Sequence, residues 1–238
     1  LTGGVVFAVM LGQLATEPLH RQIEVLVGLA VVAVAAFFPI QIPRTKHSIG
    51  VADVLVFLLL VFYGVPAAVL AAAVEGFGGA VRSSKRLTSR VGTPASAATA
   101  MGLCGLTYFA ASRGLVASGW SAPTAAMAAL PAASLVYFVA GTLPLTMVIA
   151  FKRGERLGLV NWFTSYGLVG GVYLISAAAA AVLYLNSLQF GRAVIVTAVA
   201  VVLVVIALLR TYCRRQEVER LQQEARIARA QLEAERNQ

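Results

Sequence analysis

Eight apolar runs divide the chain, and most of them approach the length that a helix needs to cross a lipid bilayer. A spanning helix takes about 20 apolar residues, because the hydrocarbon layer is roughly 30 Å thick. Of all residues, 59% are apolar and only 12% are charged, whereas a soluble domain carries about 25% charged residues. We therefore expect an all-α, polytopic transmembrane helical bundle with about seven to eight membrane segments. The runs lie near 2–15, 22–42, 49–63, 66–81, 92–112, 124–151, 160–185 and 191–212.

The lysines and arginines between these runs are distributed unevenly. If the segments alternate across the bilayer, 12 basic residues fall beside the C-terminal tail, 3 fall on the opposite side, and 4 lie in the distal tail. Short cytoplasmic loops carry the excess of Lys and Arg in membrane proteins. The split therefore predicts a cytoplasmic tail and, with eight segments, both termini in the cytoplasm. The formal charge of +9 does not indicate nucleic-acid binding, because the basic residues form no continuous patch with interleaved aromatics.

Two of the segments, 49–63 and 66–81, are short for a membrane span. At about 1.5 Å per residue they reach only some 22–24 Å each. Three arrangements follow from this length: the pair thins the bilayer, packs centrally in the bundle, or forms a re-entrant hairpin around Gly64 to Pro66. A re-entrant break is tolerated only where protein or a water-filled cavity surrounds it.

Two carboxylates fall inside these short segments. They are Asp53, in IGVADVLVF, and Glu75, in AAVEGFGGA. Charges in hydrocarbon are costly, so they usually face the bundle interior and have a partner there. Each can pair with a nearby base (Arg44 to His47 for Asp53, Arg82 for Glu75) and so stabilise the fold. Alternatively, both line a cavity for a cationic or hydrogen-bonding ligand, or they form a proton relay. The glycines after Glu75 favour close approach to another helix.

A polar and aromatic stretch, NWFTSYG, opens the segment that starts near residue 160. Tryptophan and tyrosine at that depth are typical of an interfacial belt, and ligand contact is the alternative interpretation. We include Asn161, Trp162 and Tyr166 with Asp53 and Glu75 as candidate ligand-binding residues.

The sequence contains no catalytic, cofactor or metal motif that we recognise. The histidines are His20 and His47, and the cysteines are Cys104 and Cys213. No Ser-His-Asp arrangement, phosphate loop or CxxC pair is present, so we expect no catalytic residue, cofactor or metal in this chain. Cys104 lies in an apolar run and is expected to be a packing residue.

The last apolar run continues into a charged helical tail, which we treat as a second unit: 1–212 form the bundle and 213–238 the tail. Apolar and small residues recur in the tail at alternating spacings of 3 and 4, which is typical of a heptad seam. The pattern predicts a parallel homodimer through a cytoplasmic coiled coil, and a single solvated helix is the alternative. The predicted seam residues are Val218, Leu221, Ala225, Ala228 and Leu232.

Most of the chain from about residue 22 onward resembles a known family. The stretches that carry the resemblance are FFPIQIPRTKHSIGVADVLVFLLLVFYGVPAAVL, SLVYFVAGTLPLTMVIAFKRGERLGLVNWFTSYGLVGGVYLISAAAAAVL and ALLRTYCRRQEVERLQQ. They resemble the N-terminal membrane-associated sensor region of bacterial cyclic-di-GMP signalling proteins, notably HD-GYP phosphodiesterases. The resemblance implies a sensor in the bacterial inner membrane, joined through its last helix to a cytoplasmic output domain. The chain has no HD-GYP, GGDEF or kinase core, so no catalytic residue is carried over.

These observations lead to one expected function and two alternatives. The expected function is a membrane sensor module whose partners are the lipid bilayer, a second copy of the chain and a small or lipid-like ligand. Its output enzyme, for which cyclic-di-GMP turnover is the first expectation, lies outside this chain, which we expect to be part of a longer protein. The alternatives are a small-solute transporter or channel with an oligomerising tail, and a scaffold without a ligand.

Overall fold

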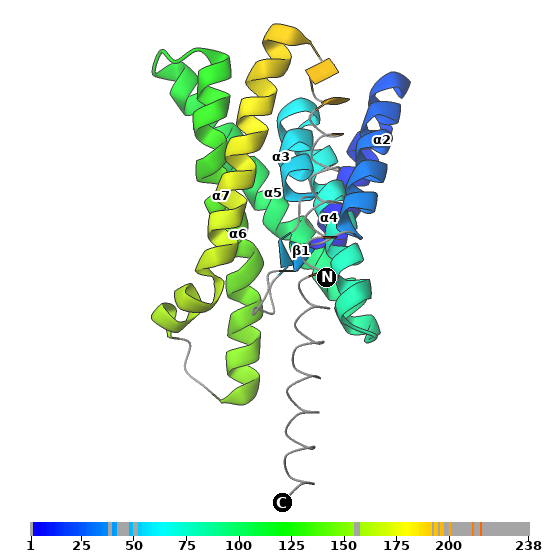
Figure 1. Ribbon diagram of the computed structural model, residues 1–238, viewed down its shortest axis with the longest axis vertical. Helices are drawn as coiled ribbons and strands as arrows, with labels where there is room; N and C mark the ends of the chain where they lie inside the picture. Colours follow the sequence, from blue (N-terminus) through cyan, green and yellow to red (C-terminus); the bar gives the residue numbers. More distant parts are fainter. Residues whose placement is uncertain are drawn as a thin grey trace, which may run out of the picture.

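The protein is a bundle of helices with one small hairpin (Figure 1). The computed structural model describes residues 2–37, 40–41, 48–49, 52–154 and 158–191, together with positions 193, 194, 196, 197, 200, 211 and 215. A two-residue antiparallel pair, β1 (Ile40–Gln41) and β2 (Ser48–Ile49), precedes the third helix. The helices are α1 (Thr2–Ala15), α2 (Leu19–Ala36), α3 (Ala52–Tyr63), α4 (Val65–Ser83), α5 (Leu87–Ala117), α6 (Ala122–Arg153) and α7 (Leu159–Phe190).

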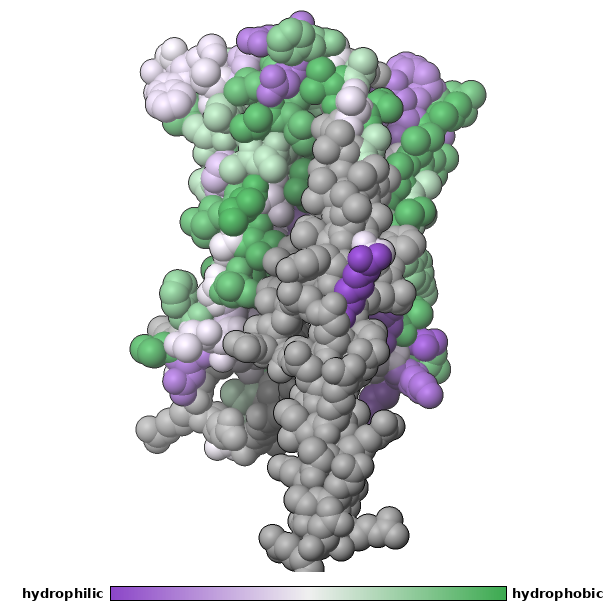
Figure 2. All heavy atoms as spheres, viewed as in Figure 1, coloured by the Kyte–Doolittle hydropathy of each residue, from purple (hydrophilic) through white to green (hydrophobic). Residues whose placement is uncertain are grey.

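Four of the described helices are long and apolar enough to cross a membrane, namely α2, α4, most of α6, and α7. Many large apolar side chains on these helices point outward, among them Leu26 and Val27 on α2 and Ile175 on α7. Hydrophobic residues dominate the visible sides of the bundle in Figure 2. In water such a surface would drive aggregation, but lipid tails accept it readily. The architecture is therefore that expected of a membrane protein.

Helices α3 and α4 occupy the centre of the bundle, which is one of the three arrangements that their short sequences allow. The two helices pack on each other; α4 also contacts α1, α2 and α5, and α3 contacts α2 and α7. In Figure 1, α3 lies between α2 on one side and α7 on the other. Gly64 joins the pair with a φ of 84°, a backbone conformation that glycine adopts without strain. Phe57 and Leu60 of α3 are completely buried.

Small residues allow α4 to pack closely against its neighbours. Ala67, Ala68, Ala71 and Ala72 are all completely buried. A Cβ atom added at Gly76 would lie 3.1 Å from the Cα of Pro94 in α5. The close approach expected from the glycines after Glu75 is therefore confirmed. Since helices in lipid gain little from hydrophobic burial, contact of this kind is a main source of their association.

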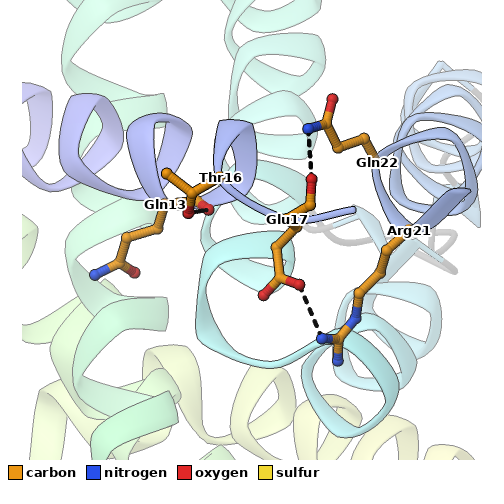
Figure 3. Close-up of polar contacts among 5 residues, drawn as sticks. All are labelled: Gln13, Thr16, Glu17, Arg21 and Gln22. Atoms are coloured by element: carbon orange, nitrogen blue, oxygen red, sulfur yellow. Dashed lines mark hydrogen bonds and ion pairs between the residues drawn. The ribbon is translucent and has the colours of Figure 1, made fainter. Parts of the chain in front are cut away.

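A compact turn joins α1 to α2, and polar side chains close it (Figure 3). The Thr16 hydroxyl donates a 2.7 Å hydrogen bond to the Gln13 carbonyl oxygen, and the Gln22 amide donates one of 2.8 Å to the Glu17 carbonyl oxygen. The Arg21 guanidinium lies 3.0 Å from the Glu17 carboxylate. These contacts satisfy backbone groups at the two helix ends and fix the turn between α1 and α2.

Three expected boundaries need correction. The apolar runs 22–42 and 49–63 overlap the hairpin, because residues 40–41 and 48–49 form strands; α2 ends at Ala36 and α3 begins at Ala52. Helix α5 begins at Leu87 rather than near 92. The polar residues at its start belong to the helix even though they do not belong to the apolar run. The seam from Val218 to Leu232 and the thiol of Cys213 lie outside the described residues.

A single methyl group between α1 and α5 is expected to destabilise the bundle. A Cβ atom at Gly3 would overlap the backbone of Ala95, including a 2.6 Å approach to its carbonyl carbon, whereas a Cβ atom at Gly4 would meet nothing within 4 Å. We expect Gly3→Ala to cost about 1–3 kcal/mol, the usual effect of overpacking, and Gly4→Ala to have little effect. Melting temperatures of the two variants in the same detergent test this; equal values would contradict the α1–α5 contact.

Candidate functional site

A cavity of about 760 Å³ lies inside the bundle and is lined by residues of six helices, α2 to α7. Pockets that hold small organic molecules usually measure about 300–1,000 Å³. The cavity extends from exposed polar residues at the connection between α4 and α5 to buried residues on α3 and α6. Its volume suits an organic molecule better than a single ion.

The two intramembrane carboxylates predicted from the sequence both line this cavity. Asp53 is in the first turn of α3 and is only 6% exposed; Glu75 is half-buried on α4. The packing of α3 on α4 brings the two groups close enough to interact electrostatically. When both are ionised, two carboxylates in a medium of low dielectric constant repel each other and are stabilised by a cation. The structure thus places both carboxylates on one cavity, and their role in ligand binding stays a prediction.

The charges around the two carboxylates differ. Glu75 interacts electrostatically with Arg82, two helical turns further along α4. The Arg82 side chain also donates a 3.1 Å hydrogen bond from Nε to the carbonyl oxygen of Gly78. Within the described part of the chain, no side chain donates a hydrogen bond to Asp53. The expected partners of Asp53, residues 44 to 47, lie outside the described residues.

Two tyrosines form the wall next to the carboxylates. Tyr137 of α6 and Tyr173 of α7 line the cavity, and their ring centroids are 4.9 Å apart with planes inclined by 60°. Both phenols interact electrostatically with Asp53 and Glu75. The Phe57 ring contacts the Tyr137 ring in an edge-to-face arrangement, with the ring centroids 5.9 Å apart. An aromatic face beside a carboxylate is a favourable environment for a cationic group.

The remaining walls differ from one side to the other. The first turns of α5 contribute hydroxyl groups at Thr88, Ser89, Thr93 and Ser96. The opposite wall is apolar and comes from α6 and α7. Gly76 and Gly79 of α4 also line the cavity, and a Cβ atom added at Gly79 would meet nothing within 4 Å. Residues of the apolar wall are Leu145, Leu168, Val169 and Val172.

Three of the predicted ligand-binding residues do not line this cavity. Asn161 is exposed near the start of α7, and Tyr166 is half-buried. The Trp162 ring stacks on Phe138 at 5.1 Å, and its indole N–H is buried without a hydrogen-bond partner among the described atoms. None of the three residues therefore supports ligand contact in this cavity.

The cavity also contains residues that the sequence alone did not single out. Tyr137 and Tyr173 lie deep in apolar runs, where no local pattern separates them from core aromatics. The hydroxyls of α5 did carry a signal, because residues 88, 89, 92, 93, 96 and 97 are all small or polar and recur at helical spacing. The prediction of a segment that begins near 92 hid this pattern, because it left residues 88 and 89 outside the helix.

Among the described residues, no group of three or more His, Cys, Asp or Glu side chains could hold a metal ion. Cys104 is buried with a free thiol, as expected for a packing residue.

No family model matches the chain, and neither the curated proteins nor the solved structures include a match. The cavity and the sequence pattern are therefore the features that indicate the function.

Proposed function

We propose that the protein is a membrane sensor module that binds a small ligand in the internal cavity. The observation that carries this proposal is Asp53, which is buried in the bundle and lines a 760 Å³ cavity shared by six helices. A group of this kind is costly in a membrane unless a ligand or another partner stabilises it. Ligand binding then changes the energies of alternative helix packings, which is the requirement for a sensor.

The cavity lies where ligand binding can affect the packing of α7. Four residues of α7 line it, and α7 also packs against α3 and α6. In our proposal, eight membrane segments place both termini in the cytoplasm, and the segment after α7 transmits the change to the tail. The described positions between 193 and 215 are all helical. Two tails joined along the heptad seam then report the packing of the bundle to an output domain.

The proposal also covers the enzymatic activity of the output domain. The stretches that resemble membrane regions of cyclic-di-GMP signalling proteins support an output in cyclic-di-GMP turnover. A diguanylate or adenylate cyclase or a kinase would use the same kind of tail.

One observation favours a transporter as the second candidate. Helix α3 has only 12 residues and carries a cavity carboxylate in its first turn. Discontinuous helices that end at a substrate site near the middle of the bilayer are typical of secondary transporters. A solute carrier is therefore tested together with the sensor.

The test combines cross-linking with a flux assay in liposomes that contain the chain. With Cys213 replaced by serine, Leu221→Cys and Ala228→Cys are expected to form disulfide-linked dimers under mild oxidation, since both lie on the seam. Gln223→Cys lies on the opposite helix face and is the matched control. Absence of dimers at both seam positions would refute the signalling dimer.

The flux assay separates the two functions. We expect liposomes that contain the chain to retain a trapped radiolabelled alkylammonium ion as well as empty liposomes do. Saturable release that depends on Asp53 would favour the transporter over the sensor.

A further inference from the structure

We propose that the cavity ligand is a small organic cation with an apolar body, whose charged group lies between Asp53 and the rings of Tyr137 and Tyr173. This inference deepens the proposed function, because it specifies the chemical class that the sensor site takes.

The charge distribution favours a cation at the Asp53 end. Asp53 is 6% exposed, and none of the described side chains donates a hydrogen bond to it, whereas Glu75 already interacts with Arg82. A buried carboxylate loses hydration, and a cation bound beside it can replace that lost interaction. A ligand cation at this end would interact with both carboxylates, since the two are close enough to interact with each other.

The arginines determine the orientation of the ligand. Arg82 and Arg86 line the same cavity, but both are exposed and lie at the connection between α4 and α5. Arg82 is seven residues beyond Glu75, which corresponds to about 10 Å along the helix axis. Positive charge at this exposed end of the cavity makes the buried, acidic end the most favourable place for a cationic group.

The size and chemistry of the walls favour an organic cation over a metal ion. Calcium is held by six to eight oxygen ligands, and the described cavity offers two carboxylates and no cluster of metal ligands. Its volume of about 760 Å³ is also far larger than an ion needs. The two tyrosine rings that line the cavity suit an ammonium group through cation–π contact. The apolar wall around Val169 and Val172 suits an alkyl or aryl body.

Calorimetry on the purified chain in an uncharged maltoside detergent tests the proposal. The probe is hexyltrimethylammonium; hexanoate and hexanol have the same chain length with a negative charge or none. We expect saturable binding of the cation and a higher melting temperature, and neither effect from the other two compounds. Asp53→Asn should weaken cation binding at least tenfold, and Glu75→Gln should weaken it less.

Two further variants keep the result interpretable. Glu17→Gln removes one carboxylate outside the cavity and should bind the probe like the parent. Val172→Trp narrows the cavity next to Tyr173 without changing its charge and should weaken binding, so the proposal remains testable if Asp53→Asn does not fold.

Equal binding of hexanoate or hexanol, or unchanged binding by a folded Asp53→Asn variant, would overturn the proposal. So would stabilisation by calcium chloride that depends on Asp53 and prevents probe binding. These failures are distinct from failure of the sensor function, which appears as absent seam dimers or as Asp53-dependent flux.

Discussion

We expect an Ala71→Phe variant to lose both its cooperative thermal unfolding and its monodisperse elution. Ala71 is completely buried in α4, and so are its neighbours Ala67, Ala68 and Ala72. Helix α4 packs against α1, α2, α3 and α5 at once, so a phenyl ring at this position has no direction in which to move. Overpacking of a dense core costs about 1–3 kcal/mol for added methylenes, and a whole ring should cost about 3 kcal/mol or more.

The matched control places the same ring on the outside of the bundle. Ala178 lies on α7 and is exposed, so we expect Ala178→Phe to face lipid and to elute and melt like the parent. Size-exclusion chromatography and thermal unfolding in one detergent provide both measurements. If Ala71→Phe melts within a degree or two of Ala178→Phe, the central position of α4 is wrong.

Seven glycines inserted after Arg215 are expected to abolish communication between the cavity and the tail. Each glycine costs about 1 kcal/mol in a helix relative to alanine, so the insertion interrupts the helix that we propose as the connection. The measurement is the rate of disulfide formation at Leu221→Cys with and without hexyltrimethylammonium. We expect the probe to change this rate in the parent and to leave it unchanged in the glycine variant.

Seven alanines at the same point form the control. They add one complete heptad and preserve both the helix and its phase, so the response to the probe should remain. Probe binding should be equal in all three proteins, because the insertion is distant in sequence from every residue that lines the cavity. A response that survives the glycine insertion would contradict transmission through a rigid helix.

The positions of most helices could be predicted from the sequence because the length of an apolar run is a local property. The runs near 66–81, 124–151 and 160–185 correspond to α4, α6 and α7. The errors occur where apolarity and helix formation diverge. Residues 40–41 and 48–49 are partly apolar but form strands, and the start of α5 is polar but helical. Hydropathy does not distinguish a polar residue in a loop from one that faces an internal cavity.

The candidate site was predictable only in part. Asp53 and Glu75 stand out in sequence because carboxylates are rare in hydrocarbon, and the structure places both on one cavity. Tyr137 and Tyr173 did not stand out, since a tyrosine inside an apolar run looks the same whether it faces lipid, core or ligand. Conversely, NWFTSYG attracted attention through its composition, although none of its residues lines the cavity.

The amino-acid sequence by itself determined the class of the molecule: a helical chain that matches a membrane in composition and carries two costly carboxylates within its apolar runs. Only the tertiary structure decided that these carboxylates share a cavity with two tyrosines from α6 and α7. The physical reason is that the cost of burying a charge depends on one residue and its solvent. The existence of a cavity depends on how small residues such as Gly76 and Ala72 let distant helices approach one another.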